Sequence, residues 1–203
     1  MGHYYELAFR DLYLPPPQCD CQHTYKVPDE NGNYHEDFEF KCKNLGRMTS
    51  ILGEYALSEN QPAVVNQSFV WSNPEPPIPA LYDIVFNTAT IAFKEVPGQT
   101  QYEWVIEMTC GTQPSDALEA LFPGGFVGLN MYSRSGPTDS DNLAEMKAAV
   151  EELGLGWAMG DWGWGFHEVP HTSDCEYSSP YEQEYSCADG ECVKVQWGLG
   201  KEL

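Results

Sequence analysis

His167, Glu168 and His171 form an HExxH pattern, the arrangement with which zinc proteases bind their metal. Histidines at this spacing bind one metal ion only when they lie one turn apart on a helix. Pro170 lies between them, and a proline opposes a helix at this point. We therefore interpret the match as chance and predict no metal site.

Glu103 and Glu107 lie four residues apart in a segment with alternating apolar residues, so they share one face of a predicted strand. On an inward face, two carboxylates could act as a general acid and base. Such alternation is more typical of a solvated outer face. We therefore predict no catalytic residue here.

The chain has seven cysteines in 203 residues, and they lack the paired CxxC pattern of a zinc site. Disulfides formed in an oxidising compartment explain them better. Cys187 and Cys192 flank four residues and predict a small disulfide loop. The odd number leaves one thiol free or paired with another chain.

The net charge of -21 comes from 31 acidic and 10 basic side chains. This charge opposes binding to nucleic acid or to an anionic membrane surface. No window approaches the roughly 18 apolar residues of a membrane span, so we predict that the chain is not membrane-spanning. No leader pattern precedes Gly2, and we expect an exported protein to have had its leader removed.

Eight strand-like runs precede one helical pattern. The strands are expected at residues 4–9, 21–27, 37–41, 47–57, 81–86, 88–94, 102–109 and 126–134. Residues 58–79 contain five prolines and predict a long irregular connection. This order predicts an all-β fold, an eight-stranded up-and-down antiparallel barrel whose mouth can hold one ligand.

The helix is expected at residues 142–153, where apolar residues recur every three or four positions. Asn142 and Glu145 fit a capping box, and Gly154 fits the stop position. Its single apolar stripe indicates packing against the outside of the barrel. Residues 1–175 would then form the barrel and helix, and residues 176–203 an irregular, acidic, disulfide-containing tail.

Aromatic side chains on the expected strands are candidates for lining the barrel. The strand period gives their alternation but not which face points inward, so the same side chains could instead pack against the helix. We choose as ligand-binding residues Phe38, Phe40, Trp104 and Tyr132.

Three tryptophans alternate loosely with glycines after the helix, at Trp157, Trp162 and Trp164. Aromatic side chains often anchor protein interfaces, so the three rings are candidates for docking a hydrophobic partner. The alternative is that this segment folds back over the barrel.

The order of these elements resembles the lipocalins, in particular apolipoprotein D-like proteins and the lipocalin domain of plant and algal violaxanthin de-epoxidases. Gly2-His3-Tyr4-Tyr5-Glu6 stands where the family has Gly-x-Trp-Tyr-Glu. Arg134 stands where the last strand ends in the arginine that packs across that tryptophan, and Tyr4 keeps an aromatic face for a cation–π contact. Residues 124–135 carry the similarity to the de-epoxidases.

The resemblance implies a non-enzymatic carrier of a small hydrophobic molecule, such as a carotenoid, sterol or fatty acid. It also implies that Cys175 pairs with Cys21, or with Cys19. No cofactor is required beyond a bound pigment or lipid, and the expected location is the thylakoid lumen or outside the cell.

Two alternatives stay open. One is an accessory subunit that docks on a larger protein complex, for example a photosynthetic membrane complex. The other is a de-epoxidase-like enzyme acting on a xanthophyll, against which stands the absence here of that enzyme's flanking segments.

Overall fold

A computed structural model describes residues 2–10, 19–28, 34–42, 48–58, 61–71, 86–99, 101–111, 126–161, 165–177, 185–188 and 191–194. Its first eight strands are β1 (Gly2–Arg10), β2 (Cys19–Pro28), β3 (Tyr34–Cys42), β4 (Met48–Ser58), β5 (Gln61–Trp71), β6 (Phe86–Glu95), β7 (Tyr102–Gly111) and β8 (Phe126–Ser133).

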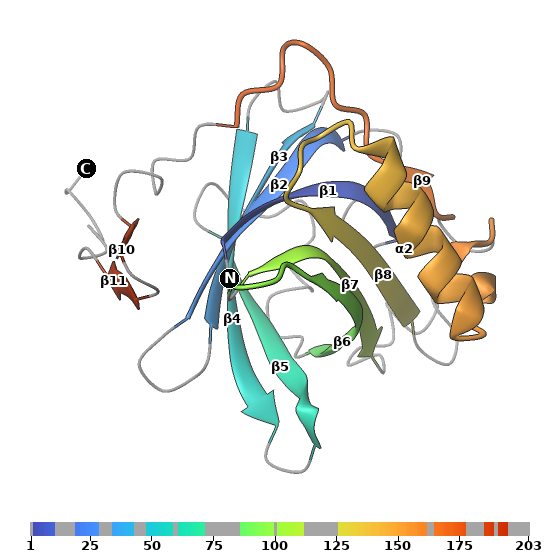
Figure 1. The fold of residues 1–203 in the computed structure, drawn as a ribbon, viewed down its shortest axis with the longest axis horizontal. Helices are drawn as coiled ribbons and strands as arrows, with labels where there is room; N and C mark the ends of the chain where they lie inside the picture. The colour runs from blue at the N-terminus through green and yellow to red at the C-terminus, as the bar shows by residue number, and fades with distance from the viewer. Residues whose placement is uncertain are drawn as a thin grey trace.

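These eight strands form a closed antiparallel ring (Figure 1). Each strand pairs with the next along the chain, and β8 pairs with β1. Because β1 also pairs with β2, with Gly2 opposite Lys26 and Tyr5 opposite His23, the ring has no open edge. The predicted eight-stranded up-and-down barrel is confirmed.

The irregular connection predicted at residues 58–79 is wrong, because β5 occupies Gln61–Trp71 and pairs with both β4 and β6. Pro62 lies between Gln61 and Val65, where the register to β4 shifts, and such irregular positions are where strands tolerate proline. Of the two strands expected next, β6 takes the place of the second, and residues 81–85 lie outside the described part of the chain.

The helix α2 (Ser140–Glu152) starts two residues before the predicted position. Its N-cap is Asp139, whose carboxylate accepts a hydrogen bond from the backbone N–H of Asn142 at 3.0 Å. The predicted capping box from Asn142 to Glu145 is therefore wrong, because both residues lie inside the helix. Gly154 ends it with a φ of +72°, a conformation that favours glycine.

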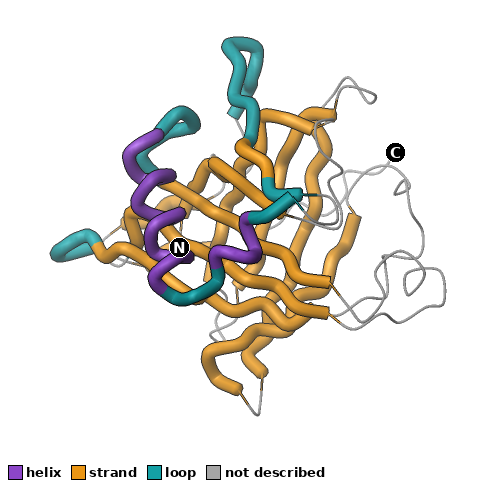
Figure 2. Tube along the Cα trace, turned by 90° about the vertical axis from the view of Figure 1, so that its right-hand side faces the viewer, coloured by secondary structure: helices purple, strands orange, loops and turns teal. Residues whose placement is uncertain are grey.

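The helix lies across the outer face of the sheet (Figure 2), and it packs there on β7 and β8. Its buried side chains Met146 and Val150 meet outward-facing residues of the barrel wall. The buried members of this outer cluster are Leu7, Ala8, Trp104, Ile106, Leu129, Met131, Met146, Val150 and Ala158.

After the helix come the 3-10 helix η2 (Gly156–Met159) and the short strand β9 (His167–Glu168), which pairs with β1. Residues 169–177 continue along the outside of β1 and β2, and we call them the C-terminal strap. Cys175 in the strap forms a disulfide with Cys21, as the resemblance implied, and Cys19 is also disulfide-bonded.

Further along, β10 (Tyr185–Ala188) and β11 (Glu191–Lys194) form a hairpin that places Cys187 opposite Cys192. The predicted bridge between these two cysteines stays a prediction. Among the described helices, none has the length and apolar character needed to cross a membrane.

Candidate functional site

One contact shows which strand faces point into the barrel. Lys26 on β2 contacts the carboxylate of Glu107 on β7, although β1 and β8 separate these strands in the ring. The contact therefore crosses the interior. Because strand side chains alternate, Thr24 and Val105 share these inward faces.

The Lys26 ammonium is held by two carboxylates inside the barrel. It bonds Glu107 Oε1, and it lies 3.5 Å from Oε1 of Glu36 on β3. The Thr24 hydroxyl donates to the same Glu36 oxygen at 2.7 Å, and the ammonium lies 4.6 Å from the ring centre of Tyr132. Lys26, Glu36 and Glu107 are all less than a tenth exposed. We call them the interior ion cluster.

Burial shifts the pKa values of Lys26 and Glu107 in opposite directions. Burial alone lowers the pKa of Lys26, but the charges of Glu107 and Glu36 outweigh it and raise that pKa above its ordinary value. Burial raises the pKa of Glu107, with Glu36 adding to the shift and Lys26 opposing it. Lys26 is therefore an ammonium at neutral pH, in an interior that resists further negative charge.

A second polar group lies on the inward faces of β1, β2 and β8. The Asn130 side-chain amide donates to Glu6 Oε1 at 2.7 Å, and both residues are buried. Gln22 on β2 precedes Thr24 by two residues. It follows Cys21, which has a φ of +58° in the register shift between Asp20 and His23 and is tied outward to Cys175. Gln22 therefore points inward, and it is completely buried.

Aromatic side chains lie beside these polar groups. Phe38 and Phe40 alternate with outward residues on β3, with ring centres 5.7 Å apart, and they share a buried cluster with Tyr4 and Tyr132. Three of the four predicted ligand-binding residues, Phe38, Phe40 and Tyr132, thus lie together on the inward side. Their contact with a ligand stays a prediction.

Trp104, the fourth predicted lining residue, does not join them. It lies in the outer cluster beneath α2, and its indole N–H donates to Glu145 on the helix at 3.1 Å. Its predicted place in the lining is corrected: β7 turns Trp104 and Ile106 to the helix and Val105 and Glu107 to the interior.

The two glutamates considered as an acid/base pair do not come together. Glu107 bonds Lys26 in the interior, whereas Glu103 accepts hydrogen bonds from Ser135 and from the Asn142 side chain outside it. They therefore have separate surroundings and separate hydrogen-bond partners.

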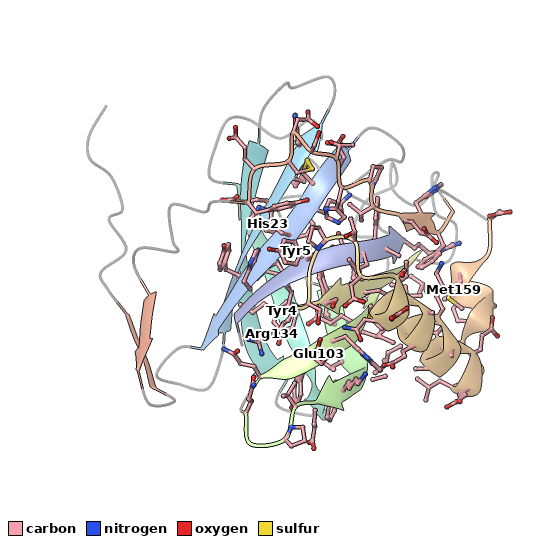
Figure 3. The ribbon with its side chains drawn as sticks, turned by 45° about the horizontal axis from the view of Figure 1, so that its top comes forward. Tyr4, Tyr5, His23, Glu103, Arg134 and Met159 are labelled. Atoms are coloured by element: carbon pink, nitrogen blue, oxygen red, sulfur yellow. A yellow bond between two sulfur atoms is a disulfide. The ribbon has the colours of Figure 1, made fainter. Side chains whose placement is uncertain are left out.

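The motif residues Gly2, Tyr4 and Arg134 lie at one end of the barrel, where Figure 3 shows Tyr4 and Arg134 close together. Burial raises the pKa of the Tyr4 hydroxyl, and the charge of Arg134 opposes the shift. The Arg134 guanidinium donates to Gln99 at 3.3 Å, and its contact with Tyr4 is electrostatic. Gly2 has a φ of +137°, and a Cβ there would lie 3.1 Å from Gln101 Nε2.

The HExxH residues lie in β9 and the strap, not on a helix. The ring of His167 lies against Phe9 and that of His171 against Tyr177. Over the described ranges, no group of three or more metal-ligating side chains is found. Because these residues are not helical, the two histidines lack the one-turn helical spacing that the zinc-protease pattern requires.

Histidines gather instead on the outer face of β1 and β2, under the strap. His3 Nε2 lies 3.1 Å from His23 Nδ1, and His171 bonds the Tyr177 hydroxyl at 2.7 Å and the backbone oxygen of Glu6 at 2.9 Å. Burial, followed by the charge of His23, lowers the pKa of His3 to about 4. We call His3, His23 and His171 the outer histidine cluster.

Of the three candidate docking tryptophans, the structure describes Trp157, which is 49% exposed on η2. Trp162 and Trp164 lie outside the described residues. Cys110 on β7 is an exposed free thiol among the described cysteines.

Sequence reasoning missed the polar interior. Lys26, Glu36 and Glu107 each alternate with other residues on a strand, and that pattern is also the pattern of a solvated face. The signal that could have found it is charge complementarity between strands, with one lysine against two glutamates. That signal can be interpreted only when the order of the strands in the sheet is known.

Comparisons with known proteins find no matching family model and no matching curated sequence. Solved structures do match. H1 crustacyanin from the lobster Homarus americanus aligns with a TM-score of 0.55 at 12% identity, covering 90% of this chain and 80% of its own. Insecticyanin from the tobacco hornworm Manduca sexta gives 0.56 at 12% identity, covering 87% and 82%. The cockroach allergen Per a 4 gives 0.50 at 12%, covering 85% of each chain. At these identities the likeness shows a shared fold.

Proposed function

We propose, starting from the lipocalin fold that this chain has, that it binds a small hydrophobic molecule inside its barrel. The observation that carries the proposal is a closed eight-stranded ring with aromatic side chains on its inward side. Eight strands enclose an interior wide enough for side chains or one small ligand. Phe38, Phe40 and Tyr132 would contact the apolar part of that ligand.

The disulfide between Cys21 and Cys175 is compatible with an oxidising compartment. Secretion and the thylakoid lumen are the two locations that we propose. A carotenoid, a sterol and a fatty acid are the ligand classes among which this proposal leaves the choice open.

The test is purification of the native protein, organic extraction, and absorption and mass spectra of the extract. A stoichiometric pigment or lipid on the lone chain is the expected result. Protein that carries no such molecule, and that does not bind an apolar fluorescent probe after mild delipidation, would contradict the proposal.

A second candidate function, docking as a subunit, has one observation in its favour. Trp157 is 49% exposed and Leu153, near the end of α2, is 50% exposed. Large exposed apolar side chains close in sequence fit an interface anchor. Co-purification of the chain with a complex, lost in a Trp157→Ser variant, would support this function.

A further inference from the structure

The inward polar side chains carry more negative than positive charge. Glu6, Glu36 and Glu107 are three inward carboxylates, and Lys26 is the ammonium that the described strands place among them. Lys26 is already bonded to Glu107 and close to Glu36. A ligand carboxylate entering this interior would meet three carboxyl groups and one ammonium that is already paired, and burying a further negative charge there is unfavourable at low dielectric.

Gln22 is the inward polar group whose bonding is incomplete. Its side chain is 0% exposed, and within the described part of the chain neither its amide oxygen nor its amide nitrogen has a hydrogen-bond partner. Buried amides are normally hydrogen-bonded, so a free pair of donor and acceptor atoms indicates a missing partner. That partner must accept from Nε2 and donate to Oε1.

A hydroxyl group does both. An ammonium can only donate, and a carboxylate can only accept. Glu6, on the neighbouring strand β1, follows the residue paired with His23, so its carboxylate adds a further acceptor near Gln22. Phe38 and Phe40, on the next strand, supply the apolar surroundings for the rest of such a molecule.

We propose that the ligand is a hydrophobic alcohol, such as a hydroxylated polyene or sterol, whose hydroxyl is bound by the Gln22 amide, and that fatty acids are excluded. The inference rests on the proposed function and names the chemical class of its ligand. The Gln22 amide favours an alcohol because it binds the hydroxyl, and the inward carboxylates disfavour a fatty acid because they repel its carboxylate.

The test uses three probes with the same chain length: dodecan-1-ol, dodecylamine and dodecanoic acid. Each displaces the neutral fluorophore N-phenyl-1-naphthylamine from the delipidated full chain at pH 7. We expect the alcohol to bind about tenfold or more tighter than the acid, which corresponds to about 1.4 kcal/mol. Tightest binding by the acid or by the amine would overturn the inference and leave the proposed function standing. Failure of the fluorophore and of all three probes to bind would instead overturn the proposed function.

Two variants assign the selectivity to residues. Gln22→Leu, which keeps the approximate volume, should weaken alcohol binding about tenfold and leave acid binding unchanged. Gln99→Leu is the matched control, because Gln99 is exposed in the turn between β6 and β7 and bonds Arg134. Equal alcohol affinity in wild type and Gln22→Leu would overturn the role of Gln22.

A second variant, Glu107→Gln, removes one inward negative charge and should narrow the ratio of alcohol to acid affinity. Glu103→Gln on the same strand, outside the ion cluster, should leave that ratio unchanged. An unchanged ratio in Glu107→Gln would overturn the charge argument, and circular dichroism confirms that each variant is folded before titration.

Discussion

At the scale of single residues, Lys26 is the ammonium that holds the carboxylates of the interior ion cluster together. It pairs with Glu36 on the neighbouring strand and with Glu107 across the barrel. Removing one partner of a buried ion pair leaves an uncompensated charge, which costs more than the intact pair contributes.

We predict that Lys26→Met lowers the free energy of unfolding by about 3–5 kcal/mol at pH 7, measured by urea denaturation. Adding Glu107→Gln to this variant should recover part of the loss. Lys94→Met is the control, because Lys94 forms an exposed ion pair with Glu145, and it should cost much less. Equal losses in the two single variants would contradict this account of the interior.

The outer histidine cluster predicts that the stability of the fold decreases at acidic pH. Because the pKa of His3 is lowered from 6.5 to about 4 in the folded protein, the unfolded chain binds its proton more readily. Stability that is complete above pH 6.5 should therefore fall as the pH decreases toward 4. His171, whose pKa burial also lowers, adds to the same trend.

We expect the variant His3→Phe to lose stability less steeply than wild type between pH 6.5 and 4, measured by thermal or urea denaturation. Phenylalanine keeps a ring to stack on Tyr25, 4.3 Å away, but binds no proton. Tyr25→Phe is the control, because it keeps every histidine and the ring that stacks on His3, and it removes the hydroxyl that donates to the Tyr177 backbone oxygen. The same pH slope in wild type and His3→Phe would refute the assignment.

At the scale of elements, α2 begins where Asp139 satisfies its first backbone N–H groups. The carboxylate also accepts from the Asn142 side chain at 2.7 Å and from the Ser133 hydroxyl at 3.1 Å, which joins the helix start to the end of β8. The cap therefore fixes both the helix and its position on the barrel.

Asp139→Ala should destabilise the protein by about 1–2 kcal/mol, the upper part of the range for N-cap losses, in chemical denaturation. Asp141→Ala is the matched control, since Asp141 is exposed in the first helical turn. A larger loss of stability in Asp141→Ala than in Asp139→Ala would contradict Asp139 as the N-cap and would favour the later helix start that the sequence predicted.

At the scale of the whole molecule, the strap is joined to the barrel by the disulfide and by backbone hydrogen bonds. Val169 N–H donates to Leu7 O at 2.9 Å, and Cys21 N–H donates to Pro170 O at 3.0 Å. Cys21 and Cys175 are 154 residues apart in sequence, so the bridge closes a loop that includes most of the barrel.

Cys175→Ser should lower the free energy of unfolding by about 4–5 kcal/mol at most, the chain-entropy value for a loop of this length. Urea denaturation under non-reducing conditions measures it, and limited proteolysis should show earlier cleavage in the strap. Cys110→Ser removes an exposed free thiol and should change little. Equal stability of the two variants would mean that the bridge does not contribute.

Local sequence patterns were enough to predict the fold class and the position of most strands, because alternation and turn residues are local signals. They failed at β5, where Pro62 and the prolines beyond the strand concealed a regular segment. The prediction of the helix start is also wrong: Asn142 has the residue type of an N-cap, but Asp139 is the N-cap in the structure.

Which strand faces point inward follows from tertiary contacts. The strand period of two is symmetric between the faces, so Trp104 could be assigned to the interior as readily as Phe38. Closing the ring removes the symmetry: Lys26 meets Glu107 across it, Trp104 turns to α2, and Gln22 is left facing the interior. The chemistry of the candidate site arises from contacts between distant strands, which no local pattern contains.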